Sequence, residues 1–177
     1  AIQPRQQREA ASFLPTGGRR SLSALAIHHL HRQAPVPVDT VAMPDGAPFG
    51  AVSIDVEGCT LCLACVGACP TGALADNPDA PMLSFTEQAC IQCGLCRNTC
   101  PESVITLEPR VNFASSANSS VVLKEEAPFE CISCGKPFGA RSSVERTIER
   151  LVKHPMFAGN DAALNRLDVD KRGLDAM

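Results

Sequence analysis

Alternating apolar and polar positions predict four short strands in the centre of the chain, at residues 50–56, 73–75, 82–85 and 104–108. Val52, Ile54 and Val56 form the apolar side of the first strand. The second and third strands pair as a hairpin, because the residues between them are the turn formers Asp, Asn, Pro and Asp. Short helices between these strands would complete an α+β fold of two similar halves.

Helical periodicity predicts one longer helix before these strands and one after them. The first covers residues 21–32, with Ser21 as its N-cap. The second begins at a capping box formed by Ser142 and Glu145. The apolar faces of the two helices consist of Leu22, Leu25, Ala26 and Leu30, and of Val144, Ile148, Leu151 and Val152. A further short helix is predicted from Asp161.

The cysteines add chemistry to this picture, because eight of the ten fall into two identical patterns. Each pattern is Cys-x2-Cys-x2-Cys-x3-Cys-Pro, the spacing typical of cubane 4Fe–4S sites. Three thiolates two residues apart wrap three corners of a cubane, and the fourth cysteine ligates the other cluster. The predicted ligands are Cys59, Cys62, Cys65 and Cys100 for cluster I, and Cys90, Cys93, Cys96 and Cys69 for cluster II.

Two other interpretations of clustered cysteines fit less well. Disulfide frameworks occur in small secreted domains with dispersed cysteines, and eleven residues would crowd two such bridges. Zinc sites pair two Cys-x2-Cys knuckles and do not use a third and fourth cysteine at these offsets. Two complete iron–sulfur clusters are therefore the preferred prediction, and their thiolates favour a reducing, cytoplasmic compartment.

The residues between the cysteines predict different potentials for the two clusters. Small or apolar residues surround the first motif, whereas Gln92, Arg97, Asn98 and Thr99 surround the second. Hydrogen bonds to sulfur and positive charge favour the more negative, reduced state of a cluster. We therefore expect cluster II to have the higher potential.

Charge divides the chain into regions. Residues 1–33 hold five arginines against one glutamate, whereas residues 45–108 hold eight acidic residues against one arginine. An acidic electron carrier is steered toward basic partner surfaces. The basic arm contains Arg19 and Arg20, which invite comparison with a twin-arginine export signal, but no plausible cleavage site follows and a helix start is favoured. No stretch reaches the roughly 18 apolar residues of a membrane span.

These observations divide the chain into a basic arm over residues 1–48, a domain with both cysteine motifs over 49–110, a flexible linker over 111–120 and a tail over 121–177. His28, His29 and His31 in the arm have no Cys-x-x-Cys-His motif beside them. We interpret them as a polar helix face and not as a haem or metal site.

The remaining cysteines, Cys131 and Cys134, form a knuckle followed by Gly135. One knuckle supplies two of the four ligands that zinc needs, and His154 is the other nearby candidate. The pair is half of a zinc site completed beyond Met177, half of a site shared with a partner, a redox-active disulfide, or two inert thiols. The flanking glycine and proline favour the incomplete zinc site.

With all eight ligands matched, residues 49–110 resemble the bacterial two-cluster ferredoxins. The segments Gly46–Gly50 and Pro128–Phe138 resemble the C-terminal part of longer multi-cluster ferredoxin proteins of proteobacteria. This resemblance implies a longer parent protein, and a tail whose relatives end in a second cysteine pair. It also implies partners such as a flavin- or molybdenum-containing oxidoreductase, for example a formate dehydrogenase.

The sequence thus predicts an electron carrier that moves one electron at a time through two 4Fe–4S clusters, free or as a subunit of a larger complex. No residues of the sequence form a recognisable catalytic motif, because it has neither a nucleotide-binding loop nor a nucleophile–base pair. An iron–sulfur sensor or assembly protein is the alternative.

Overall fold

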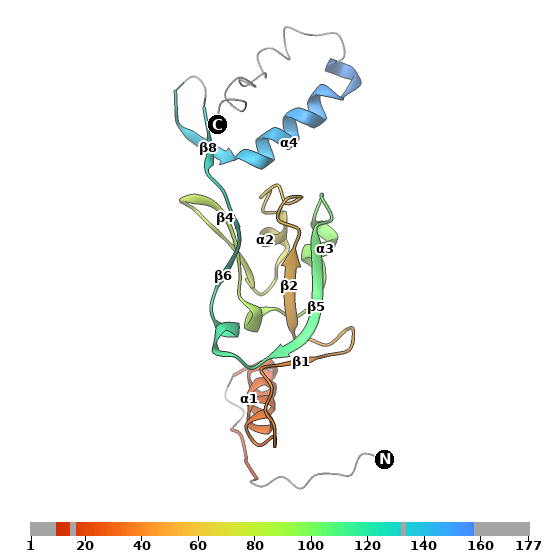
Figure 1. Ribbon diagram of the computed structural model, residues 1–177, viewed down its shortest axis with the longest axis vertical. Coiled ribbons are helices and arrows are strands. Elements are labelled where there is room, and N and C mark those ends of the chain that lie inside the picture. Colours follow the sequence, from red (N-terminus) through yellow and green to blue (C-terminus); the bar gives the residue numbers. More distant parts are fainter. Residues whose placement is uncertain (1–9, 15–16, 132–133, 158–177) are drawn as a thin grey trace.

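The computed structural model describes residues 10–14, 17–131 and 134–157. These form an elongated molecule with the helix α1 (Arg19–Arg32) at one end, the cysteine motifs in the middle, and the helix α4 (Arg141–Val152) at the other end (Figure 1). None of the helices in the described ranges is long and apolar enough to cross a membrane.

The first sheet contains β1 (Thr40–Ala42), β5 (Ile105–Asn112) and β2 (Gly50–Ile54), in that order and all antiparallel. The first and last predicted strands are confirmed, and Ile54 pairs with Ile105. The prediction of Val56 within the first strand was wrong. The chain turns after Ile54, where Asp55 Oδ1 accepts a hydrogen bond from the N–H of Glu57, and Val56 is exposed.

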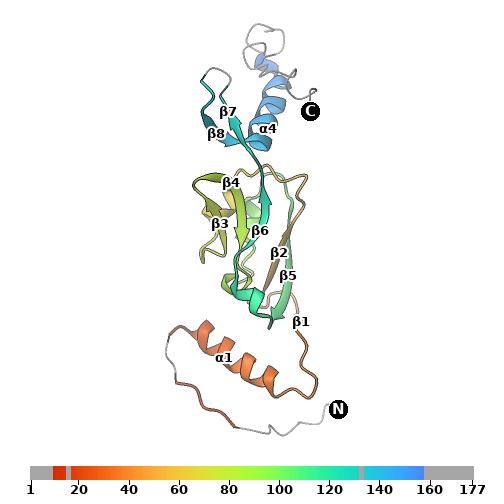
Figure 2. The same cartoon turned by 60° about the vertical axis from the view of Figure 1, so that its left-hand side comes forward.

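The second sheet contains β3 (Leu74–Asn77), β4 (Ala80–Phe85) and β6 (Val121–Glu125), again antiparallel. The predicted hairpin is confirmed, with a tighter turn than expected, because Asn77 Oδ1 accepts a hydrogen bond from the N–H of Asp79 at 2.9 Å. β1 and β6 lie outside residues 49–110. Segments on both sides of that range therefore pair with its strands, and β6 leads upward into β7 (Pro128–Glu130) (Figure 2).

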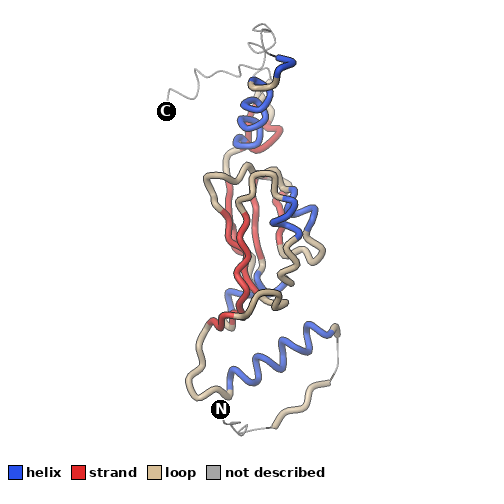
Figure 3. The backbone as a smooth tube through the Cα atoms, turned by 90° about the vertical axis from the view of Figure 1, so that its right-hand side faces the viewer, coloured by secondary structure: helices blue, strands red, loops and turns tan. Residues whose placement is uncertain are grey.

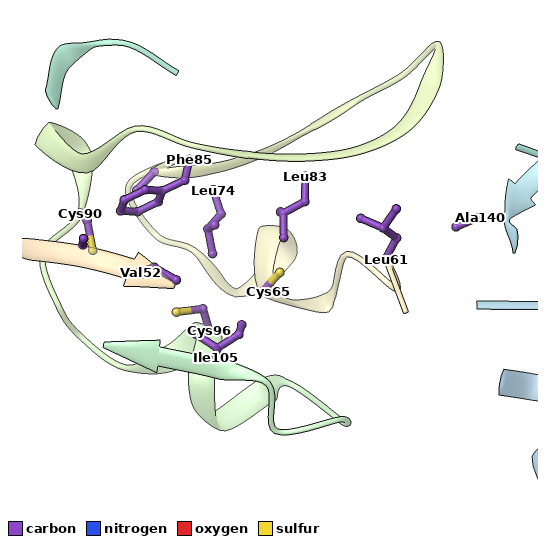
Figure 4. Packing of buried hydrophobic residues seen from close by; sticks show 12 residues of the cluster. Val52, Leu61, Cys65, Leu74, Leu83, Phe85, Cys90, Cys96, Ile105 and Ala140 are labelled. Atoms are coloured by element: carbon purple, nitrogen blue, oxygen red, sulfur yellow. The ribbon is translucent and has the colours of Figure 1, made fainter. Parts of the chain in front are cut away.

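Two short helices, α2 (Ala64–Ala68) and α3 (Leu95–Thr99), follow the cysteine loops as predicted and lie beside the strands (Figure 3). Each contains the third cysteine of its motif. Figure 4 shows Cys65, Cys90 and Cys96 among the buried side chains of the core. The apolar part of this core includes Ala51, Val52, Leu61, Leu74, Leu83, Phe85 and Ile105.

The N-terminal helix begins earlier than predicted. The N-cap is Gly18 and not Ser21, because the backbone becomes helical at Arg19 and no side chain caps the helix. Its residues remain partly or fully exposed, and Leu25 is half exposed. The histidine face packs on an aromatic ring, since His31 stacks on Phe113 with ring centroids 3.7 Å apart.

The segment over residues 111–120 contains the end of β5 and the 3-10 turn η2 (Ser115–Asn118), in which Ala117 is buried. It has regular structure where a flexible linker was expected. The buried methyl group of Ala117 explains part of this difference, because an open linker would leave that group in water.

The C-terminal part contains the hairpin of β7 and β8 (Pro137–Ala140), the helix α4 and the turn η3 (Pro155–Phe157). The capping-box prediction was wrong: α4 begins at Arg141, and no side chain of the helix caps it. Instead Glu126 Oε1 accepts hydrogen bonds from the N–H and the hydroxyl of Ser142, at 3.0 and 2.8 Å. The helix predicted from Asp161 lies outside the described residues.

Candidate metal centres

The first motif and one cysteine of the second line a single cavity. Its thiols belong to Cys59, Cys62, Cys65 and Cys100. The remaining lining is almost entirely apolar, with Ile54, Leu61, Leu63, Leu83, Val104 and Ile105, and Glu102 is the charged exception. The loop curves around the cavity because Leu61 and Leu63 adopt left-handed backbone conformations, with φ of 48° and 57°. These conformations are costly for residues other than glycine.

The second cavity repeats this arrangement. Its thiols belong to Cys69, Cys90, Cys93 and Cys96. Gln92 and Gly94 take the left-handed conformations here, with φ of 54° and 77°, at the same offsets from the first cysteine as Leu61 and Leu63. The two loops therefore share one backbone shape, and the fourth cysteine of each motif lies in the cavity of the other. This is the grouping that the spacing predicts; ligation itself stays a prediction.

The thiols in these cavities destabilise one another's charged forms. Burial and the neighbouring Cys59 and Cys62 raise the pKa of Cys65 to about 11. Burial also raises the pKa of Cys96, and Cys90, Cys93 and Cys69 contribute. Metal binding requires thiolates, and a positively charged core at the centre of each group would remove this repulsion. The donor set thus fits a cationic iron–sulfur core in each cavity.

Hydrogen-bond donors are concentrated at the second cavity. The backbone N–H and the side-chain amide of Gln92 donate to Cys90 Sγ at 3.5 and 3.4 Å. Burial alone would raise the pKa of Cys69, but the N–H groups of Leu74, Thr71 and Ala73 and the Thr71 hydroxyl lower it overall. Donors of this kind stabilise negative charge on sulfur.

The described residues contain no group of three His, Cys, Asp or Glu side chains close enough to hold one metal ion. A cubane iron–sulfur core presents its irons at separate corners, so four thiolates around one cavity can each bind a different iron.

Two families match the chain, and both are described as a 4Fe-4S dicluster domain. One match covers residues 58–105 and includes all eight motif cysteines, and the other covers residues 89–136. The central part of the chain therefore contains a two-cluster, ferredoxin-like domain. Domains of this type bind iron–sulfur clusters and carry electrons, and they indicate a carrier more than a catalyst. No curated protein matches this chain.

The ferredoxin-like protein carries Cys131 and Cys134 in the turn between β7 and β8. The N–H of Cys131 donates to Lys136 O at 2.9 Å, and the N–H of Gly135 donates to Cys131 O at 2.8 Å. His154 does not join them as part of a three-residue metal group in the described chain; its Nδ1 accepts the N–H of Met156. The second family match includes this knuckle.

Sequence reasoning missed two cations at the cysteine loops of this ferredoxin-like protein, Arg20 and Lys124. Arg20 lies 70 residues before its contact at Cys90, and Lys124 lies 65 residues after its contact at Cys59. Cysteine spacing carries no signal for such distant partners. The pairing of β6 with β4, which brings Lys124 to its loop, is equally non-local.

Proposed function

We propose that the protein binds one 4Fe–4S cluster in each cavity and transfers single electrons between partner proteins. Cluster I takes Cys59, Cys62, Cys65 and Cys100, and cluster II takes Cys90, Cys93, Cys96 and Cys69. The observation that carries this proposal is the crossed grouping of four thiols around each of two apolar cavities. When bound, each cluster supplies a site that accepts and releases one electron.

The protein's own residues have three tasks in this function. The cysteines hold each core, and the apolar lining limits access of water, which tunes potential. Cys62 and Cys93 are exposed, whereas Cys65, Cys90 and Cys96 are buried. We infer that redox partners approach at these two exposed cysteines, one at each cluster, because electron transfer is favoured where the cluster lies nearest the surface.

The partner is best sought among flavin- or molybdenum-containing oxidoreductases, with a formate dehydrogenase as one candidate. Support comes only from the resemblance of residues 46–50 and 128–138 to longer proteobacterial multi-cluster ferredoxin proteins. The same resemblance favours a bacterial protein acting in the cytoplasm, either free or as a subunit. Gentle anaerobic purification of the native protein would identify the partner that co-elutes.

The crossed ligation gives a direct test. The full chain is loaded with iron and sulfide without air, and its iron content and EPR spectra are measured. Cys100→Ser should alter the signal of the cluster at Cys59, Cys62 and Cys65, whereas Cys69→Ser should alter the other signal. Two variants that each disturb the cluster of their own motif would overturn the crossed assignment.

An iron–sulfur sensor or assembly protein remains the second candidate function. A carrier cycles reversibly and keeps its clusters through repeated reduction and oxidation. A sensor loses or converts a cluster on mild oxidation and changes its affinity for a partner. Iron content before and after several redox cycles separates the two.

Cys131 and Cys134 are proposed as half of a zinc site. Support comes from Gly135, which has a φ of 70° and whose N–H donates to Cys131 O at 2.8 Å. A tetrahedral zinc site needs two further ligands, which we propose come from another part of the chain or from a partner protein.

A further inference from the structure

Arg20 of α1 holds the loop that begins at cluster II. Its guanidinium donates to the carbonyl oxygen of Cys90 at 2.6 Å and to that of Gln88 at 3.0 Å, and it also reaches Pro48 O. The same group lies over the ring of Phe49, 4.6 Å from the centroid. Hydrogen bonds and a ring contact together fix the charge of Arg20 beside the first cysteine of the second motif.

Lys124 of β6 does the same at cluster I. Its ammonium group donates to the carbonyl oxygen of Cys59 at 2.5 Å and to that of Val56 at 2.9 Å. The Lys124 side chain is only 11 % exposed, so its charge is held close to the protein and is weakly screened.

The two cations occupy equivalent positions. Cys59 and Cys90 are the first cysteines of the two motifs, and in each case a cation bonds the carbonyl of that cysteine. In the sequence, Arg20 precedes the cysteine motifs and Lys124 follows them. In Figure 1, their elements are well separated, because α1 lies below the middle of the molecule and β6 runs along it. A repeat of the cysteine motif does not account for this match, since neither cation belongs to a motif.

The surroundings of the two cations differ. Lys124 lies 3.9 Å from the carboxylate of Glu126, which offsets part of its charge. Arg20 forms no ion pair with any residue that the structure describes. Glu102, which lines the cavity of cluster I, is itself paired with Arg146 and Arg150. The charge of Arg20 is therefore less offset by a neighbouring carboxylate than the charge of Lys124.

We propose that Arg20 and Lys124 are matched positioning cations that raise the reduction potentials of cluster II and cluster I separately, with the larger effect from Arg20. This inference rests on the proposed function. Reduction adds one negative charge to a cluster, and a nearby fixed cation stabilises that charge in a medium of low dielectric. The arrangement also supplies a physical cause for the expected higher potential of cluster II.

The test is a redox titration of the loaded full chain, followed by EPR, with the signals assigned from the Cys69→Ser and Cys100→Ser variants. Arg20→Gln should lower the equilibrium constant for reduction of cluster II about tenfold, or about 59 mV for one electron, and leave cluster I unchanged. Lys124→Gln should lower the potential of cluster I alone, by a smaller amount. Arg19→Gln and Lys136→Gln are matched controls, because both side chains are exposed and no hydrogen bond in the described structure joins either to the loops at Cys59 and Cys90; they should shift neither cluster.

A variant that keeps the positive charge separates the electrostatic effect from a loss of folding. Arg20→Lys should keep most of the original potential of cluster II, because it retains the charge that Arg20→Gln removes. Unchanged potentials in Arg20→Gln, or a potential in Arg20→Lys as low as that in Arg20→Gln, would overturn the proposal. So would failure of both variants to bind iron, since Arg20 would then only maintain the fold. If the unaltered chain shows no pair of 4Fe–4S signals, the proposed function fails before any variant is compared.

Discussion

Gly50 offers the sharpest test of how the sheet supports cluster II. A methyl group at this position would lie 2.4 Å from the backbone oxygen of Glu108, and 2.6 and 2.7 Å from the side-chain amide of Gln92. Contacts this short require movement. The backbone of Glu108 is fixed in the ladder between β2 and β5, so Gly50→Ala should push Gln92 away from its site.

The cost follows from these contacts. Overpacking a tight site costs about 1–3 kcal/mol. Moving Gln92 also removes its hydrogen bonds to Ala51 O, at 2.8 Å, and to Cys90 Sγ, each worth about 1 kcal/mol. We therefore expect Gly50→Ala to lose about 3–5 kcal/mol, a large part of the about 5–15 kcal/mol that stabilises a typical domain.

Loss of a cofactor makes unfolding irreversible, so the assay is kinetic. The loaded protein is diluted into guanidinium, and the decay of its visible iron–sulfur absorbance is followed. Gly67→Ala is the matched control, because nothing lies within 4 Å of the added methyl group and alanine favours the helix α2. Gly50→Ala should bleach many times faster than the control. Equal rates would show that the close approach between β2 and Gln92 does not constrain the protein.

Three further outcomes are expected. Burial alone would raise the pKa of Glu87, but hydrogen bonds from Arg110 and Asn112 and the charge of Arg110 lower it. The stabilising effect of the Glu87 carboxylate should therefore be complete above the unfolded pKa near 4.5, and it should disappear as pH falls through the lower folded pKa. Glu87→Gln should thus be less stable than the unaltered chain at neutral pH and equal to it in acid. Glu102→Gln should speed hydrogen exchange in α4, because Glu102 bonds Arg146 at 2.9 Å and Arg150 at 2.8 Å; exchange that stays slow would refute the anchoring role. Cys131→Ser combined with Cys134→Ser should leave the iron content unchanged and remove bound zinc, and a loss of iron instead would mean that the knuckle supports a cluster.

The sequence was most informative where the signal was local. Each cysteine loop carries its ligands within eleven residues, and its backbone shape follows from Leu61, Leu63, Gln92 and Gly94 adopting left-handed conformations. The central hairpin was equally predictable, because its turn residues and alternating strands are adjacent in the chain. Which thiols share a cavity also followed, since the offset of the fourth cysteine is a property of the motif.

Features that depend on distant partners were not predictable from patterns. Ser142 and Glu145 have the spacing of a capping box, yet Glu126 satisfies the N–H of Ser142 from outside the helix. A carboxylate at a helix N-terminus competes well for such a donor, because the helix dipole favours negative charge there. In α1, Arg19 and Arg20 are good helix formers, so the helix extends past the serine that resembled a cap.

The arm and the tail each contact one of the two cysteine loops. On one side, α1 reaches the Cys90 loop through Arg20. On the other, the Cys59 loop bonds Lys124, Lys124 pairs with Glu126, and Glu126 caps α4 through Ser142. A movement of α4 or α1 would therefore displace a charge that lies against a cluster loop. Because binding energies and redox equilibria are linked reciprocally, a partner that shifts either helix would change the potential of one cluster and leave the other in place. If Arg20 and Lys124 tune the clusters as proposed, their location in two separate segments would let a partner adjust each cluster independently.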